Sequence, residues 1–338
     1  MYTANESSAL AARPARRGGT VMLITAVPVA TPDACERTEA MADQASLRPA
    51  RLKAGVIGTG RVGAVLGAAL ARAGHQVVAV SAVSERSRAA AARMLPGVPV
   101  APPPEVLAAA DLVLLTVPDD ALPALVSGLA STGAPVTGRL LAHTSGRYGA
   151  AVLDPATRDG ALPMALHPVM TFTGRPDDLD RLDGISWGVT APEPVLPAAE
   201  ALVIEMGGEP VVIGEASRAL YHAGLASAAN HLVALVAQSA DVLRAAGVAE
   251  PSRMLAPLLS AALDNALRLG DAGLTGPVAR GDADTVAGHI AALRDTSPEA
   301  LHAYLALARL TADRALAAGI LSAPDAQRLL GVLSGAPR

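Results

Sequence analysis

A short loop with three glycines constrains the fold of this chain more than any other feature. It has the spacing G-x-G-x-x-G and reads Gly58-Thr59-Gly60-Arg61-Val62-Gly63. The apolar segment 52–57 before it predicts a strand, and the alanine-rich segment 64–73 after it predicts a helix. Between a strand and a helix, such glycines allow a tight turn, a pyrophosphate against the backbone, and close helix–strand packing. The helix N-terminus also offers free N–H groups to phosphates, so the segment predicts an α/β dinucleotide-binding fold.

The end of the second expected strand, 76–82, indicates which dinucleotide is preferred. An NAD site usually places Asp or Glu there, on the ribose 2′-hydroxyl. This chain carries Ser84, Arg86 and Ser87 instead. They could hold a 2′-phosphate, because arginine binds phosphate bidentately. Glu85 could reverse the choice, and all four residues could simply be solvated positions that open the next helix. We favour NADP (NADPH) as the cofactor.

Further apolar segments predict strands at 111–117, 140–146, 161–166, 185–190 and 210–213. Three of these strand ends carry residues of interest, at Val117-Pro118, His143–Ser145 and His167. Ligands of open α/β sheets lie beyond the carboxyl ends of strands, so we expect these residues to share one crevice. Asp119 or Asp120 is expected to cap the helix that follows.

From residue 215 onward the pattern predicts helices only, at 216–246, 251–269, 282–293, 298–318 and 323–333. The first is long and apolar, which is typical of a domain spine or a dimer core. Its polar exceptions include His222 and Asn230, which are eight residues apart and therefore expected on one face. A polar turn at 274–282, with Thr275 and Arg280, could reach a ligand.

Composition excludes several classes of function. The net charge of -4 and the 2% of aromatic residues argue against nucleic-acid binding. The single cysteine, Cys35, excludes a disulfide framework and any multi-cysteine metal site, and we expect no metal. Lys53 is the only lysine, so no mechanism can rely on a catalytic lysine elsewhere.

Residues 1–50 show no sustained period, and we expect a disordered N-terminal extension; an alternative is an over-called start, with Met22 as the real one. Arginines precede an apolar run at 21–30, so a secretory signal is an alternative, but the run is short and interrupted by Pro28. No apolar run is expected to span a membrane, and we expect a cytoplasmic protein. The predicted domains are 51–214, which binds the dinucleotide, and 215–335, which is helical.

Taken in order, the motifs Gly58–Gly63, 117–120, 143–146, 166–168 and 274–282 resemble Rossmann-like proteins with a C-terminal domain of unknown function 2520. The resemblance covers about residues 51–335. Such proteins are similar to pyrroline-5-carboxylate reductase, ketopantoate reductase and the 6-phosphogluconate and 3-hydroxyisobutyrate dehydrogenases. The resemblance implies an NAD(P)-dependent enzyme with an N-terminal Rossmann domain. It also implies an all-α, 6-phosphogluconate dehydrogenase-like C-terminal domain that forms a homodimer.

The sequence departs from these relatives at the proton donor. The hydroxyacid dehydrogenases use a helical Lys-x-x-x-Asn, in which lysine donates the proton. Asn230 matches the asparagine here, but Ala226 stands at the lysine position. In addition, Leu274-Thr275-Gly276-Pro277 resembles the turn that holds the substrate carboxylate in pyrroline-5-carboxylate reductases, but the two glycines of that turn are replaced.

His167 or His143 could therefore donate the proton, and we place His167 first, with Ser145 and Asn230 as further catalytic residues. The alternative for His167 is a structural residue before a proline at a strand end. Thr275, Arg280 and His222 are the expected substrate-binding residues, although each could be an ordinary surface or interface residue. The leading hypothesis is an NADP-dependent oxidoreductase that reduces a small 2-oxo or imino acid, with ketopantoate as the first candidate. The alternative is a non-catalytic NAD(P)-binding or sensing protein, because a fold does not prove a function.

Overall fold

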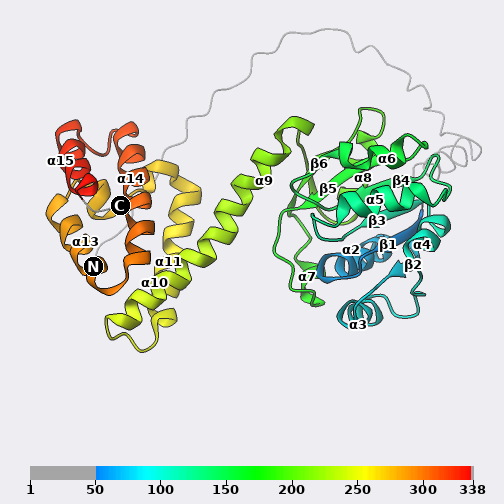
Figure 1. Ribbon diagram of the computed structural model, residues 1–338, viewed down its shortest axis with the longest axis horizontal. Coiled ribbons are helices and arrows are strands. Elements are labelled where there is room, and N and C mark those ends of the chain that lie inside the picture. The colour runs from blue at the N-terminus through cyan, green and yellow to red at the C-terminus, as the bar shows by residue number, and fades with distance from the viewer. Residues whose placement is uncertain (1–50, 336–338) are drawn as a thin grey trace, which may run out of the picture. The chain divides into compact units, whose positions relative to one another are not determined.

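The computed structural model describes residues 51–335, so the expectations for residues 1–50 lie outside the described part of the chain. Its first region is built on a seven-stranded sheet with the order β2-β1-β3-β4-β5-β6-β7 (Figure 1). The strands are β1 (Lys53–Ile57), β2 (Gln76–Ser81), β3 (Leu112–Leu115), β4 (Leu140–His143), β5 (Leu162–Pro168), β6 (Ser186–Thr190) and β7 (Glu209–Val212). Neighbouring strands are parallel except for β5 and β6, which are antiparallel. The expected α/β fold is confirmed.

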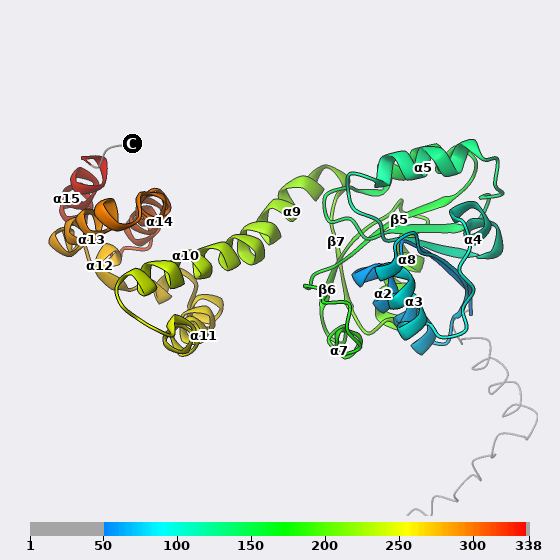
Figure 2. The same ribbon diagram turned by 60° about the horizontal axis from the view of Figure 1, so that its bottom comes forward.

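Side chains along each strand alternate between the two faces of the sheet. Helices pack against both faces. Leu112 and Leu114 belong to one apolar cluster, with residues of α2 and α8. Val113 and Leu115 belong to the other, with residues of α4 and α5. Figure 2 shows α5 along one face and α2 with α3 along the other. The helices are α2 (Arg61–Arg72), α3 (Glu85–Met94), α4 (Pro103–Ala109), α5 (Leu122–Ser131), α6 (Asp154–Thr157), α7 (Asp177–Asp180) and α8 (Leu196–Glu205).

The expected capping of α5 by Asp119 or Asp120 is wrong. The residue before the helix is Ala121, and no side chain caps it. A backbone turn replaces the cap, since the N–H groups of Ala121 and Leu122 both donate to the carbonyl of Pro118.

The second region consists of helices only, as expected. They are α9 (Arg218–Ala226), a π-helical turn (Ser227–His231), α10 (Leu232–Ala245), α11 (Pro251–Leu269), α12 (Gly276–Ala279), α13 (Ala283–Thr296), α14 (Pro298–Ala317) and α15 (Ala323–Ser334). A buried cluster that includes Val286, Leu305 and Leu329 joins α13, α14 and α15. This region therefore has an apolar core of its own.

The helical stretch Glu215–Ala245 has a mean hydropathy of 1.2 in its most apolar window, and none of that window is buried. By length and composition alone it could cross a membrane. The expectation that no apolar run is long enough was wrong, because residues 219–240 contain no Asp, Glu, Lys or Arg. An apolar helix left uncovered in this way needs another surface to pack against.

Candidate functional site

The glycine loop between β1 and α2 has the geometry of a phosphate cradle. Gly58 has φ +97°, a conformation that favours glycine. A Cβ at Gly63 would lie 2.3 Å from Oγ1 of Thr116, so only glycine allows α2 to pack this closely. At Gly60 a Cβ would meet no heavy atom within 4 Å, which leaves open space above the loop. No side chain caps α2, and its first turn has no acid. Its N–H groups are thus available to an anion.

Two threonines hold this loop in place. Thr59 is fully buried, and its hydroxyl donates to the carbonyl of Ser81 at 3.1 Å. The Thr59 side chain thus ties the loop to β2 and does not face a ligand. Thr116, which the sequence analysis missed, donates to the carbonyl of Gly58 at 2.8 Å. Val117 and Pro118 follow at the end of β3, and Val117 packs against Gly58.

The segment after β2 both caps a helix and lines a cavity. Ser84 caps α3 by accepting the Ser87 N–H at 3.1 Å, and the Ser87 hydroxyl donates to the Ser84 carbonyl at 2.8 Å. With Arg86, the two serines also line a cavity of about 640 Å³. The cavity is lined by Gly60, Arg61, Ser84, Arg86, Ser87, Ala89, Ala90, Arg93 and Thr173–Pro176.

A second group of polar residues lies after β4. His143 is buried, and its Nδ1 accepts the Ser145 N–H at 3.2 Å, so its Nε2 carries the hydrogen and donates to the Gly149 carbonyl at 2.8 Å. Burial lowers the pKa of His143 to about 4. Ser145 is also buried, and its Oγ accepts the N–H groups of Arg147 and Tyr148. Both side chains are engaged in holding the turn, and among residues 51–335 no acceptor takes the Ser145 hydroxyl hydrogen.

His167, at the end of β5, lies in a cluster with residues of α9. Its Nδ1 is 2.8 Å from the Tyr221 hydroxyl, and its ring packs edge-on against His222 with 5.9 Å between centroids. A Cβ at Gly146 would lie 2.8 Å from Nε2 of His167 and 2.6 Å from the His222 ring. Glycine at position 146 is therefore what lets the two histidines approach the turn after β4.

Arg218 lies beside this cluster at the start of α9. The side chain is buried, donates to the Gly188 carbonyl at 3.3 Å, and has no partner in residues 51–335 for Nε and one terminal nitrogen. Its guanidinium carbon is 5.7 Å from the centre of the Tyr221 ring. Burial lowers the pKa of Arg218 and raises that of Tyr221.

The environment of His167 sets its protonation state. Burial, the Arg218 cation and the neighbouring His222 together lower the pKa of His167 to about 4. The imidazole is therefore neutral near pH 7. We expected a histidine that titrates near neutrality, and this expectation was wrong. The charged imidazole would be buried next to the Arg218 cation, which disfavours protonation.

Of the predicted residues of the helical region, His222 joins this cluster, whereas Asn230, Thr275 and Arg280 do not join it within the described chain. Asn230 lies in the π-helical turn and is exposed, so the argument that a buried amide needs a ligand does not hold for a single chain. Arg280 follows α12 and is also exposed. Thr275 lines a mainly apolar cavity of about 690 Å³ among α10–α14. The π-helical turn was not foreseen, and such turns are frequent at functional sites.

Comparison with known proteins agrees with the order of the two regions. Residues 35–168 match the family of Rossmann-like domains, and residues 185–311 match a domain of unknown function (DUF2520). This chain is a Rossmann-like protein with a DUF2520 domain. The resemblance drawn from the motifs is confirmed. No curated protein matches the chain.

Solved structures share the fold of this Rossmann-like protein at low identity. A Bacteroides fragilis protein described as an NADP oxidoreductase has 22% identity and a TM-score of 0.63, over 78% of this chain and 98% of its own. A reductive aminase from Aspergillus terreus, solved with NADPH and ethyl levulinate, has 20% identity and a TM-score of 0.59, over 83% and 99%. An imine reductase from Streptomyces aurantiacus has 20% identity and a TM-score of 0.53, over 82% and 99%.

Proposed function

We propose that this protein is an NADP-dependent oxidoreductase that reduces a small 2-oxo or imino acid. The observation that carries the proposal is the open cradle at Gly60 beside a cavity lined by arginines. The similar folds of an NADP oxidoreductase and of an NADPH-bound reductive aminase support it. Because a reductive aminase and an imine reductase are among the similar folds, imines belong in the substrate class beside 2-oxo acids.

The residues of the glycine loop fit the cofactor. The uncapped N–H groups of Arg61, Val62 and Gly63 would bind the pyrophosphate, at the positive end of the α2 dipole. Ser84, Arg86 and Ser87 would bind the ribose 2′-phosphate, and Val117 with Pro118 would line the path beyond β3. When bound, NADPH would supply a hydride to the substrate carbon.

His167 and Tyr221 form a path for the proton. In this path the Tyr221 hydroxyl donates to Nδ1 of His167, 2.8 Å away, and the imidazole hydrogen is on Nε2. As Nε2 gives this proton to a developing alkoxide, Nδ1 takes the tyrosine proton. The Arg218 cation beside the ring stabilises the resulting tyrosinate. This relay uses the neutral imidazole, and it replaces the missing lysine at position 226.

His222 packs against His167 and would contact the substrate, and the Ser145 hydroxyl would donate to it. We keep Asn230, Thr275 and Arg280 as substrate contacts that a second subunit would contribute. The exposed apolar stretch 219–240 supports such a homodimer. Light scattering should give twice the monomer mass, and a monodisperse monomer at micromolar concentration would contradict the dimer.

We further propose that the domain boundary falls near Gly214, where the strands end and the helices begin, and that the protein works in the cytoplasm. The proposed reaction needs no partner other than the small substrate and a second copy of this chain. Metal is not needed either, since the proton path consists of side chains.

The test of function is NADPH consumption with a panel of 2-oxo acids, ketopantoate first, and cyclic imines. His167→Ala should lower kcat by about 10²- to 10⁴-fold, the usual contribution of a general acid, with a smaller rise in KM. Tyr221→Phe removes one hydroxyl only and should lower kcat for ketones more than for iminium substrates, whose reduced nitrogen needs no proton.

His302→Ala, at an exposed position of α14, is the control and should leave kcat unchanged. A protein that binds NADPH but turns over no member of the panel would instead be the non-catalytic binding or sensing protein. The absence of a helical lysine, with Ala226 in its place, is the observation that favours this second candidate.

A further inference from the structure

The loop between β5 and β6 lies against the cofactor end of the sheet, far from its position in the sequence. Thr173–Pro176 line the same cavity as Gly60 and Arg86. The short helix α7, which follows this loop, packs against α2. One wall of the proposed 2′-phosphate cavity is thus formed by a segment that is not part of the glycine loop or of β2.

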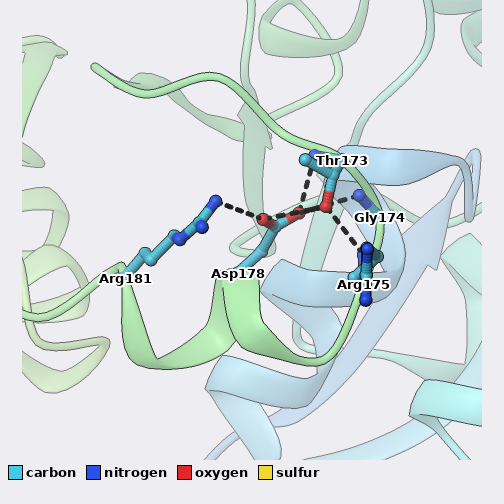
Figure 3. A network of polar contacts seen from close by, with 5 residues as sticks. All are labelled: Thr173, Gly174, Arg175, Asp178 and Arg181. Carbon is cyan, nitrogen blue, oxygen red and sulfur yellow. Dashed lines mark hydrogen bonds and ion pairs between the residues drawn. The ribbon is translucent and has the colours of Figure 1, made fainter. Parts of the chain in front are cut away.

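A buried carboxylate fixes the shape of this loop (Figure 3). Asp178 is fully buried, and its Oδ2 accepts the N–H groups of Thr173 and Gly174, each at 2.7 Å. It also accepts the Thr173 hydroxyl at 3.1 Å, and this hydroxyl in turn accepts the Arg175 N–H at 3.3 Å. Such a network orders the backbone around Arg175 before any ligand arrives.

The loop also contacts α2 and α3, the two helices that carry the other arginines of the cavity. Gly174 has φ +78°, and a Cβ there would lie 2.9 Å from Cγ and 3.2 Å from Cα of Arg61, the first residue of α2. The Gly174 carbonyl accepts a hydrogen bond from Arg93 of α3 at 2.7 Å. These contacts place Arg175 next to the start of α2.

The cavity is strongly cationic. Four of its lining residues are arginines, namely Arg61, Arg86, Arg93 and Arg175. None of its lining residues is acidic. Arg61, Arg86 and Arg175 form no ion pair with any carboxylate in residues 51–335. Like charges gathered around one cavity repel one another unless an anion neutralises them. A phosphate dianion, with three acceptor oxygens, matches several guanidinium groups at once.

We propose that Arg175 is a further specificity-determining residue, which binds the 2′-phosphate of the dinucleotide together with Arg86, and that Asp178 positions it. The proposal rests on the proposed function. It assigns the preference for a 2′-phosphorylated nucleotide to two segments, of which only the one after β2 is expected from the sequence.

The experiment compares Arg175→Ala with wild type in calorimetric titrations of two matched ligand pairs. NADPH and NADH differ only in the 2′-phosphate, as do adenosine 2′,5′-bisphosphate and AMP. Arg175→Ala should weaken NADPH and adenosine 2′,5′-bisphosphate by about 10- to 100-fold, the scale of a hydrogen bond to a charged group, and should leave NADH and AMP within about twofold. Arg175 is exposed, so the variant should fold.

Arg158→Ala, at an exposed position after α6, is the control and should bind all four ligands like wild type. Unchanged binding of NADPH by Arg175→Ala would overturn the proposal. An equal loss for NADH and AMP would also overturn it, because Arg175 would then bind the shared phosphates. If the wild-type protein bound neither dinucleotide, the proposed function itself would fail, and that result is distinct from the other two.

Discussion

The two regions of this molecule bury their apolar side chains to very different extents. In the sheet region, α2 buries eight of its 12 residues, whereas α10 in the helical region buries only Ala240 of its 14. Exposed large side chains gather in the helical region, where Leu220 and Leu267 are each 79% exposed. Large exposed apolar patches of this kind mark interaction surfaces.

The difference shows which parts of the proposed site are complete within one chain. The cofactor cradle and the His167 cluster are held by hydrogen bonds and packing of the sheet region and the start of α9. Asn230 and Arg280 lie on exposed positions of the helical region. We therefore expect the sheet-side residues to act in a single subunit and the helical residues to act only in an assembly.

Truncating one leucine in each region gives the largest expected difference. Leu66 of α2 is fully buried, so Leu66→Ala should lower the free energy of unfolding by about 2–5 kcal/mol. Leu267→Ala removes an exposed side chain and should change it by less than about 0.5 kcal/mol at low protein concentration. Urea unfolding followed by circular dichroism measures both. Equal losses in the free energy of unfolding for the two variants would mean that the helical region buries its leucines as fully as the sheet region does.

A second prediction contrasts a buried histidine of the sheet region with an exposed one of the helical region. The pKa of His143 is about 4 in the fold and near 6.5 in the unfolded chain. The fold therefore favours the neutral form. The stability contribution of this neutral form is complete above pH 6.5 and is lost as the pH falls toward 4, by on the order of 3 kcal/mol.

His143→Gln should flatten this part of the pH profile, while His302→Gln should leave it unchanged because His302 is exposed. Free energies of unfolding between pH 7 and 4 provide the measurement. A profile that stays as steep in His143→Gln as in wild type would show that other groups, such as carboxylates, cause the acid sensitivity.

The smallest expected effect contrasts two arginines that the sequence offers as ligands. Arg86→Ala should weaken NADPH binding by about 1–3 kcal/mol and spare NADH, because it removes a charged hydrogen bond to the 2′-phosphate. Arg280→Ala should leave the affinity for both dinucleotides unchanged. A loss of NADPH affinity in Arg280→Ala would place the helical turn at the cofactor and not at the substrate.

The sequence predicts most of the sheet region because its signals are local. The spacing of Gly58, Gly60 and Gly63 specifies the loop, and the apolar segments specify the strands to within a few residues. Helix α4 was missed, since its prolines at the first turn looked like a loop. The prediction of caps at Asp119 and Asp120 failed because a backbone turn serves instead.

The candidate site was predicted less completely, because its contacts join distant residues. His167 and Tyr221 are 54 positions apart, and no local pattern connects them. The role of Asp178 was hidden in the acidic run Asp177–Asp180, which resembles a solvated segment although this one carboxylate is buried. Arg218 was also missed, because a charged residue at a helix start is normally exposed, whereas this arginine is buried.

A titration of the wild-type protein with NADPH and with NADH decides whether the cavity beside the glycine loop selects a 2′-phosphorylated dinucleotide. NADPH should bind more tightly, because Ser84 and Arg86 stand where an acid would select NAD. Arginines also line the adjoining cavity. Equal affinity for the two dinucleotides, or tighter binding of NADH, would contradict it.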